Sequence, residues 1–237
     1  HVTNTGTQIQ IMQALGGNVP TFAHHSLLTG PQGEALSKRL GVLALKDLRE
    51  AGIAPQALLS LMSRLGSSDP VELRTDMQTL IDGFDISRFG SSPTKFDAED
   101  LKPLTAHYLQ TLKAADVAED IRALGVPDAQ AEQFWAVTRE NITTLHDLKG
   151  WWAMFTQGAT PVIADEDRDF IAQAMGLLPE GPFDTETWGK WTTDVKEATG
   201  RKGKGLFMPL RLALTGQAHG PDMSSVMPLL QTVKARG

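Results

Sequence analysis

The feature that most constrains the fold is the spacing of apolar residues from Leu45 onward, where they recur every three or four positions. This spacing is typical of α-helices that bury one face. Pro55 and the pair Asp69-Pro70 are predicted to begin helices, because proline fits the first turn and aspartate caps it. Gly66 and Gly83 are predicted to end these helices. The chain is therefore predicted to be mainly α, with the apolar stripes of its helices forming the core.

Further helices are predicted in the rest of the chain, each with an apolar stripe and a cap or a glycine at one end. Their expected ranges are about 97–112, 118–124, 128–140, 165–175 and 184–199. A last helix is expected to start at Pro221. Trp151, Trp152 and Phe155 form the densest aromatic group, and aromatic rings can stack on unpaired bases. At this spacing they more often anchor packed helices, and we predict that they belong to the core.

The front of the chain departs from this pattern. Residues 8–15 are predicted to form a helix capped by Asn4 or Thr5. Residues 21–28 are predicted to form a strand that runs into the turn Gly30-Pro31-Gln32-Gly33. A strand beside helices indicates a small α/β part in front of the helical remainder.

Composition excludes several classes of protein. The 237 residues include no cysteine, which excludes disulfides and cysteine-bound zinc and suits the reducing cytoplasm. No apolar run reaches the ~18 residues that a membrane helix needs. The chain does not open with a secretory signal pattern, and its six histidines are not spaced as metal ligands. We therefore expect a cytoplasmic protein without membrane contact and without a metal site.

The distribution of charge leaves two kinds of partner open. A net charge of −6 disfavours nucleic acid as a partner, because neutralisation of phosphates dominates such binding. Five cations nevertheless lie close together near the C-terminus, namely Lys196, Arg201, Lys202, Lys204 and Arg211. This segment is either an RNA-binding footprint on an acidic protein or a solvated basic loop.

A first candidate site is the segment 34–41, which carries Ser37, Lys38 and Arg39 next to glycines. A hydroxyl and two cations on a loop can stabilise an oxyanion. The tripeptide alone is a weak signal, and the glycine–lysine spacing of a Walker A phosphate-binding loop is absent.

A second candidate site is the string 205–221, a short apolar run that contains one arginine, Arg211. Pro209 is predicted to lie in the first turn of a helix that Gly216 ends. Arg211 lies between two leucines, so its side chain is predicted to leave the helix on another face. On this pattern alone Arg211 is a solvated charge or a partner in a local ion pair.

Residues 206–221, LFMPLRLALTGQAHGP, closely resemble the LFMPLRxALTGxxHGP signature of the anticodon-binding domain of glutamyl-tRNA synthetases. The segment 33–41 is similar to the GxKLSKRxG form of the class I synthetase signature loop. Other stretches also resemble the family: residues 1–8 (DHxxNTxxQ), 27–31 (LLLGPDG) and 84–97 (FDxxRxxxSPxxFD). The motifs occur in the family's order, and the resemblance covers essentially the whole chain.

The resemblance implies a mainly α fold in four parts. These are a small α/β remnant of a class I, Rossmann-type catalytic domain (1–44), a helical tRNA stem-contact region (45–105) and two helical anticodon-binding bundles (106–155 and 156–237). In the family, the histidine motif that cradles ATP and the glutamate-binding residues precede the position of His1. The chain is therefore expected to be a C-terminal fragment, whether natural, engineered or proteolytic, that does not charge tRNA alone.

The resemblance also implies an ATP site in the intact enzyme. Lys38, supported by Ser37 and Arg39, would stabilise the charge that spreads onto the phosphates during adenylate formation, with Mg²⁺ accompanying ATP. Relatives usually have lysine at Ala35, so one charged contact differs here. The expected ATP-binding residues are Leu27, Leu28, Ala35, Leu36, Ser37, Lys38 and Arg39, and no cofactor is expected to be bound to the fragment.

Anticodon contacts are implied for Met208, Arg211, Gly220, Pro221 and Met223. Arg211 offers planar donors to a base, the Gly220-Pro221 turn lets backbone groups approach, and Met223 provides a pliable apolar contact. A further position in the family pattern is Asn141, where many relatives carry arginine. Its amide either bonds a base edge or caps the next helix.

The function implied is ligation of glutamate to tRNA(Glu) with ATP through a glutamyl-adenylate, by a protein expected to be a monomer. Whether tRNA(Gln) is also charged is left open by the sequence. Two alternatives compete with this interpretation, namely a stand-alone helical RNA-binding module and a helical protein-interaction domain. The signature loop argues against the first, and the negative net charge favours the second.

Overall fold

The structure is a computed structural model that describes residues 2–36 and 44–236. It divides into two compact units, unit 1 (His1–Thr105) and unit 2 (Ala106–Gly237). The segment with Ser37, Lys38 and Arg39 lies outside the described residues. Among the residues that are described, no helix is long and apolar enough to span a bilayer.

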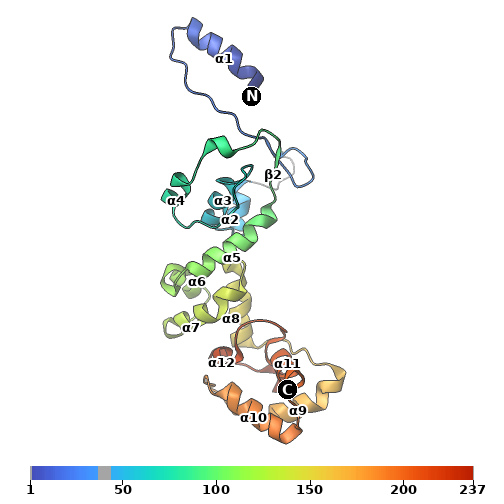
Figure 1. The fold of residues 1–237 in the computed structure, drawn as a ribbon. Coiled ribbons are helices and arrows are strands. Elements are labelled where there is room, and N and C mark those ends of the chain that lie inside the picture. The colour runs from blue at the N-terminus through green and yellow to red at the C-terminus, as the bar shows by residue number, and fades with distance from the viewer. Residues whose placement is uncertain (1, 37–43, 237) are drawn as a thin grey trace. The chain divides into compact units, whose positions relative to one another are not determined.

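Unit 1 combines short helices with a sheet of two parallel strands (Figure 1). Its elements are α1 (Val2–Ala14), β1 (Leu28–Thr29), α2 (Leu45–Glu50), α3 (Pro55–Met62), α4 (Met77–Asp82), the 3₁₀ turn η2 (Ile86–Arg88), β2 (Thr94–Lys95), the 3₁₀ turn η3 (Ala98–Asp100) and α5 (Leu101–Thr111), in which the unit boundary falls. Leu28 pairs with Thr94 and Thr29 with Lys95. The predicted strand 21–28 is therefore mostly wrong, since only Leu28 of that range lies in β1, which is Leu28–Thr29.

The core of unit 1 is small. Leu48 of α2, Leu61 of α3, Phe96 and Leu101 are buried against one another. Since this cluster is modest, polar contacts between loops contribute more to holding the unit together than they would in a larger core.

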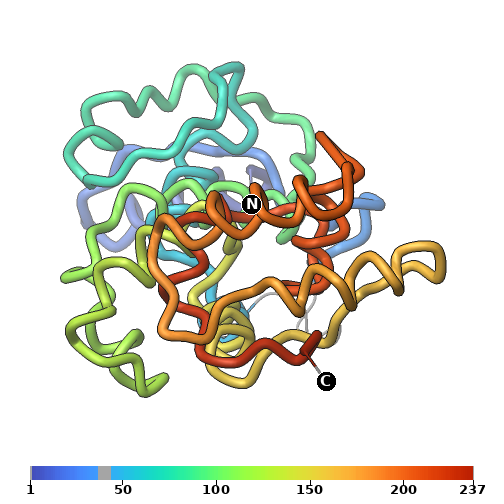
Figure 2. Tube along the Cα trace, turned by 90° about the horizontal axis from the view of Figure 1, so that it is seen from below, coloured from blue at the N-terminus to red at the C-terminus, as the bar shows by residue number. Residues whose placement is uncertain are grey.

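The regular secondary structure of the described residues of unit 2 consists of helices only. Its helices are α6 (Ala118–Ala123), α7 (Asp128–Thr138), α8 (Leu148–Gln157), α9 (Arg168–Leu177), α10 (Thr187–Thr199), α11 (Lys204–Thr215) and α12 (Met223–Val226). Short 3₁₀ turns join them at Ala114–Val117, Arg139–Asn141, Leu145–Asp147, Asp165–Asp167, Met227–Leu229 and Lys234–Arg236. Figures 1 and 2 both show α9, α10 and α11 packed side by side.

Aromatic residues dominate the core of unit 2. Phe134, Trp135 and Trp191 are almost fully buried. The indole N–H of Trp135 donates to the Leu112 carbonyl at 2.9 Å, and that of Trp191 to the Ala174 carbonyl at 2.8 Å, so neither ring leaves its polar atom unpaired. Trp151 and Phe155 are also buried and Trp152 packs partly against the same core, as predicted.

The prediction that Asp69-Pro70 begins a helix is wrong. The helix α4 begins at Met77, and its cap is Asp76, whose carboxylate accepts from the Thr79 N–H at 2.9 Å. Hydrogen bonds from Thr79 lower the pKa of Asp76 below its usual range. Both aspartates precede apolar positions, but the carboxylate of Asp69 is engaged by two arginines and does not cap a helix.

Other helix starts also differ from the prediction. α1 already begins at Val2, so neither Asn4 nor Thr5 is its cap. α12 begins at Met223 after the cap Asp222, not at Pro221. α11 begins at Lys204, which places Pro209 inside the helix and not in its first turn.

The interior proline is accommodated by an arginine. Pro209 has no N–H, so the carbonyl of Gly205, one turn earlier, loses its helical partner. The Arg201 guanidinium donates to this carbonyl through Nη1 at 3.3 Å. One cation of the basic segment therefore compensates for the proline that the family signature places in α11.

Candidate nucleic-acid interface

The helix α11 presents one face to the core and another to the loop that follows it. Leu206, Leu210 and Leu214 are buried, whereas Arg211 lies on the opposite face and is half-buried. Gly216 ends the helix with φ 67°, and a Cβ there would lie 2.9 Å from the Thr160 carbonyl oxygen. Only glycine fits this left-handed and crowded position. The chain therefore turns sharply into residues 217–222.

Arg211 holds this loop against the helix. Its Nη1 donates to the Pro221 carbonyl at 2.8 Å. The Thr215 hydroxyl donates to the Arg211 carbonyl at 2.8 Å and accepts from the Gln217 N–H at 3.2 Å. The beginning and the end of the loop are thus each bonded to the last turns of α11.

Gly220 lets the guanidinium approach the loop closely. Its φ is +146°, and a Cβ would lie 2.5 Å from Arg211 Nη2 and 3.4 Å from the Trp151 ring. Any larger residue would force the arginine to move. The sequence resemblance groups Arg211, Gly220 and Pro221, and in the structure these three residues pack against one another.

The Arg211 guanidinium is partly buried and only partly hydrogen-bonded. Burial lowers the pKa of its guanidinium, and nearby Asp222 opposes this effect. An arginine remains protonated at neutral pH even so. Its Nε is buried and makes no hydrogen bond to any described residue. Arg211 is therefore a charged, partly desolvated group that forms no ion pair with any residue of 2–36 or 44–236, contrary to both pattern-based interpretations.

The other anticodon candidates differ in accessibility. Met208 is half-buried one turn before Arg211, and Pro221 is half-buried in the loop. Met223 is only 4% exposed and belongs to the core, so its side chain is much less accessible than expected for a base contact.

Asn141 lies in the 3₁₀ turn after α7 and is exposed. Its amide donates to the Val137 carbonyl at 3.5 Å, in the preceding helix. The cap of the next turn, Leu145–Asp147, is Thr144, and the Asp147 carboxylate accepts from the Thr143 and Thr144 N–H groups. The prediction that Asn141 caps the next helix is therefore wrong, and no described hydrogen bond or ion pair joins it to the Arg211 loop.

The basic segment is divided between structural and free cations. Arg201 forms an ion pair with Asp167 and lies over the Phe170 ring, 4.0 Å from its centroid. Lys202 and Lys204 are exposed, and neither forms an ion pair within the described ranges. Only the two lysines therefore remain as candidates for phosphate contacts in residues 201–204.

The part of the expected ATP site that is described lies around β1. The Gly30 N–H donates to the Glu34 carbonyl at 2.8 Å, and Thr29 forms an antiparallel bridge with Ala35. This turn brings Ala35 and Leu36 back beside Leu28 of β1, while Leu27 is 70% exposed.

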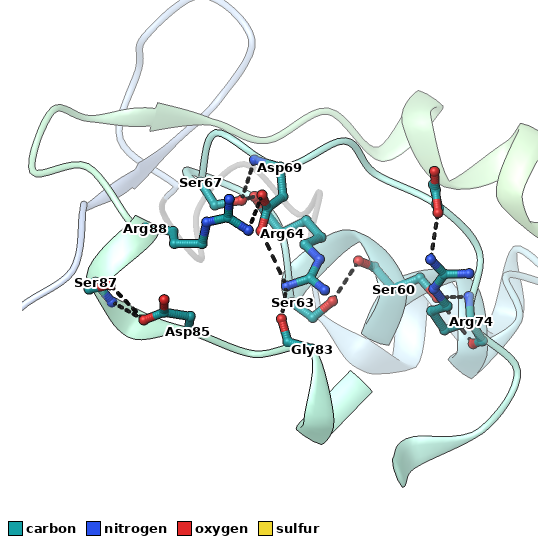
Figure 3. A network of polar contacts seen from close by, with 11 residues as sticks. Ser60, Ser63, Arg64, Ser67, Asp69, Arg74, Gly83, Asp85, Ser87 and Arg88 are labelled. Carbon is teal, nitrogen blue, oxygen red and sulfur yellow. Dashed lines mark hydrogen bonds and ion pairs between the residues drawn. The ribbon is translucent and has the colours of Figure 1, made fainter. Parts of the chain in front are cut away.

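A second cluster of cations lies in unit 1 (Figure 3). Asp69 forms ion pairs with Arg88 Nη1, at 2.7 Å, and with Arg64 Nη1, at 3.7 Å. Arg64 Nη1 also donates to the Gly83 carbonyl at 2.6 Å. The Arg88 side chain remains 53% exposed, while that of Asp69 is 14% exposed. Two guanidinium groups share one carboxylate, so the cluster keeps a net positive charge. We call these three residues the Asp69 latch.

Sequence reasoning missed Phe207 and the Asp69 latch. Phe207 is 44% exposed although it lies in an apolar string. The helical period does place it on the same face as Arg211, four residues later, and this signal could have identified it. No local pattern indicates that Asp69 pairs with arginines from two other segments.

Comparisons with known proteins cover both units. Residues 98–235 match the family described as "Anticodon binding domain", and residues 1–103 match "tRNA synthetases class I (E and Q), catalytic domain". Glutamate--tRNA ligase 2 of Ruegeria sp. (strain TM1040) is 73% identical over 237 residues, which are 100% of this chain and 54% of the relative. Glutamate--tRNA ligase 1 of Roseobacter denitrificans is 73% identical over 236 residues, with coverages of 100% and 54%.

A solved structure shows the same fold. The glutamate-tRNA synthetase from Elizabethkingia anophelis matches with a TM-score of 0.75 and 23% identity, over 97% of this chain and 52% of that one. The chain spans about half the length of the curated relatives it matches.

Proposed function

Because the chain belongs to the glutamyl-tRNA synthetase family, we propose that it is the tRNA-binding, anticodon-recognising part of an enzyme that ligates glutamate to tRNA(Glu). The enzyme uses ATP, accompanied by Mg²⁺, to form a glutamyl-adenylate before transfer to tRNA. It acts in the cytoplasm as a monomer. The observation that carries this proposal is the Arg211 guanidinium, partly desolvated and held against the Gly220-Pro221 loop.

The geometry suits recognition of an unpaired base. A loop fixed at both ends has little freedom left to lose, so an RNA bound there pays a small ordering cost. Within the described residues Arg211 Nη2 makes no hydrogen bond and, unlike Nε, is not among the buried unpaired atoms. Arginine offers planar donors and a stacking surface to a splayed base. Met208, Gly220, Pro221 and Met223 shape the surroundings of the base, and Asn141 contacts a second position in the anticodon loop.

Four functional parts are proposed along the chain. Residues 1–44 continue the catalytic domain, in which Lys38, with Ser37 and Arg39, stabilises the phosphates of ATP, next to Leu27, Leu28, Ala35 and Leu36. Residues 45–105 contact the tRNA stem, and residues 106–155 and 156–237 bind the anticodon. The division of the structure into two compact units near residue 105 supports the second of these boundaries.

The test is a fluorescence-anisotropy titration of the 237-residue chain with tRNA(Glu), an anticodon-substituted tRNA(Glu) and tRNA(Gln). We expect binding to tRNA(Glu) that falls with salt, by a log–log slope of about 0.7 to 0.9 per phosphate contacted. Anticodon substitution is expected to weaken binding about tenfold, as loss of one or two base contacts does. A protein-interaction domain would show no salt-dependent binding to any of the three RNAs.

A charging assay tests whether the 237 residues alone can attach glutamate to tRNA. With ATP, Mg²⁺, glutamate and tRNA(Glu), the 237 residues alone are expected to form no glutamyl-tRNA. Product above the background without protein would contradict the proposal that they supply only tRNA binding and the signature loop.

A further inference from the structure

An exposed stripe runs along α11 to the Arg211 loop. Phe207 and Met208 lie three and four residues after Lys204 and four and three residues before Arg211, so the four residues lie on one face of the helix. None of them is fully buried, whereas Leu206 and Leu210 on the opposite face are. We call these four residues the α11 stripe. It ends where Arg211 bonds Pro221, so it is continuous with the proposed anticodon interface.

Phe207 is an unusual residue for such a surface. Its ring is 44% exposed, and its one described ring contact is with Trp188 of α10, at 6.3 Å between centroids and a tilt of 38°. Trp188 in turn packs edge-on against buried Trp191 at 5.6 Å. The aromatic ring is thus supported from the core side while much of its surface is open to solvent.

The charge around Phe207 favours one kind of partner. Lys204 lies one turn before it and is exposed, Lys202 precedes the helix, and Arg211 follows one turn later. These cations gather on a protein whose net charge is −6. An open aromatic ring flanked by cations binds single-stranded nucleic acid, since the ring stacks on a base and the cations meet the phosphates. An apolar peptide would gain nothing from the lysines.

We propose that Phe207 stacks on an unpaired base of the RNA bound at Arg211, and that Lys204 contacts the phosphate of that nucleotide. This rests on the proposed function. The stacked base is a neighbour of the base that Arg211 contacts, because Phe207 and Arg211 are one turn apart on the same face. The stacking is not specific for base identity, since every base offers a π-face.

The experiment compares variants of the 237-residue chain in anisotropy titrations with a fluorescein-labelled anticodon stem-loop of tRNA(Glu). Phe207→Leu removes the ring but keeps an apolar side chain, and it is expected to weaken binding about tenfold. Phe207→Tyr keeps the ring and is expected to stay within about twofold of the unsubstituted chain. The matched control is Phe22→Leu, because Phe22 is a partly exposed ring in residues 1–44, outside the parts proposed to contact tRNA, and should leave stem-loop binding unchanged.

Abasic nucleotides distinguish stacking from other causes. Placed at each anticodon-loop position in turn, they remove the base and keep the phosphate. At one position the abasic RNA should bind the unsubstituted chain about tenfold more weakly and show no further loss with Phe207→Leu. Lys204→Gln should lower the log–log salt slope by about 1.

The outcomes separate the two proposals. If the unsubstituted chain binds and Phe207→Leu binds equally well, the stacking proposal is wrong while the proposed function stands. A loss with Phe207→Leu that persists at every abasic position would also overturn stacking, since the ring would then act through packing. If the unsubstituted chain does not bind the stem-loop at all, both proposals fail.

Discussion

Replacing Arg211 by methionine is expected to weaken binding of the anticodon stem-loop of tRNA(Glu) about thirtyfold, or roughly 2 kcal/mol. Methionine keeps the length and apolar stem of the side chain, so the packing along α11 changes little. It removes the charge, the donors to RNA and the hydrogen bond to the Pro221 carbonyl. Loss of that bond also frees the loop, so the RNA must order it on binding.

Arg211→Lys distinguishes charge from geometry. Nη1 of Arg211 bonds the Pro221 carbonyl, and Nη2 packs so close to Gly220 that a Cβ there would lie 2.5 Å from it, so the guanidinium meets the loop with two nitrogens. A lysine has a single ammonium group and cannot reproduce both. We therefore expect Arg211→Lys to recover less than half of the lost binding free energy, although the charge is restored.

The matched control is Arg168→Met in the same unit. Arg168 is an exposed arginine of α9 that pairs with Asp165 at 2.7 Å. Arg168→Met removes the same charge as Arg211→Met. We expect it to change the affinity for the stem-loop by no more than about twofold, because exposed ion pairs contribute little. Equal losses in the two variants would mean that only the net charge of unit 2 matters. Urea denaturation followed by tryptophan fluorescence checks that both variants remain folded.

The sequence predicted best those features that depend on a few neighbouring residues. Pro55 begins α3 and Gly200 follows α10 with φ 71°, because proline and glycine set the backbone locally. Trp151 and Phe155 were assigned to the core because their spacing matched one helix face, and both are buried. The two family strings identified the fold, which the comparisons show.

Predictions failed where distant segments compete for one group. Asp69 and Asp76 are each followed by apolar residues at helical spacing, so each could cap a helix. Their neighbours in sequence do not distinguish the two. Arg64, five residues earlier, and Arg88, nineteen residues later, decide the outcome because both pair with the Asp69 carboxylate. For the same reason, the helical periodicity of α11 predicts the face on which Arg211 lies but not its hydrogen bond to Pro221. That bond depends on the path of the loop that follows the helix.

Asp69→Ala is expected to lower the stability of unit 1 by about 2 to 3 kcal/mol, the scale of breaking a largely buried ion pair by removing one partner. The carboxylate joins Arg64, at the end of α3, to Arg88 in η2 (Figure 3). Without it, two guanidinium groups face each other with no counter-charge, and the small core of unit 1 offers little compensation. The control is Asp85→Ala, which removes an exposed cap of Ser87 and should cost about 0.5 to 1 kcal/mol.

The placement of the tryptophans makes this measurable unit by unit. All five, Trp135, Trp151, Trp152, Trp188 and Trp191, lie in unit 2, so their fluorescence reports on that unit alone. Circular dichroism reports on the helices of both units. In a urea titration, the loss of dichroism that precedes the fluorescence transition reports the unfolding of unit 1. Asp69→Ala should shift this loss to lower urea concentration and leave the fluorescence midpoint unchanged. If Asp69→Ala and Asp85→Ala shift the dichroism equally, Asp69 is an ordinary surface cap and the latch does not hold these loops together.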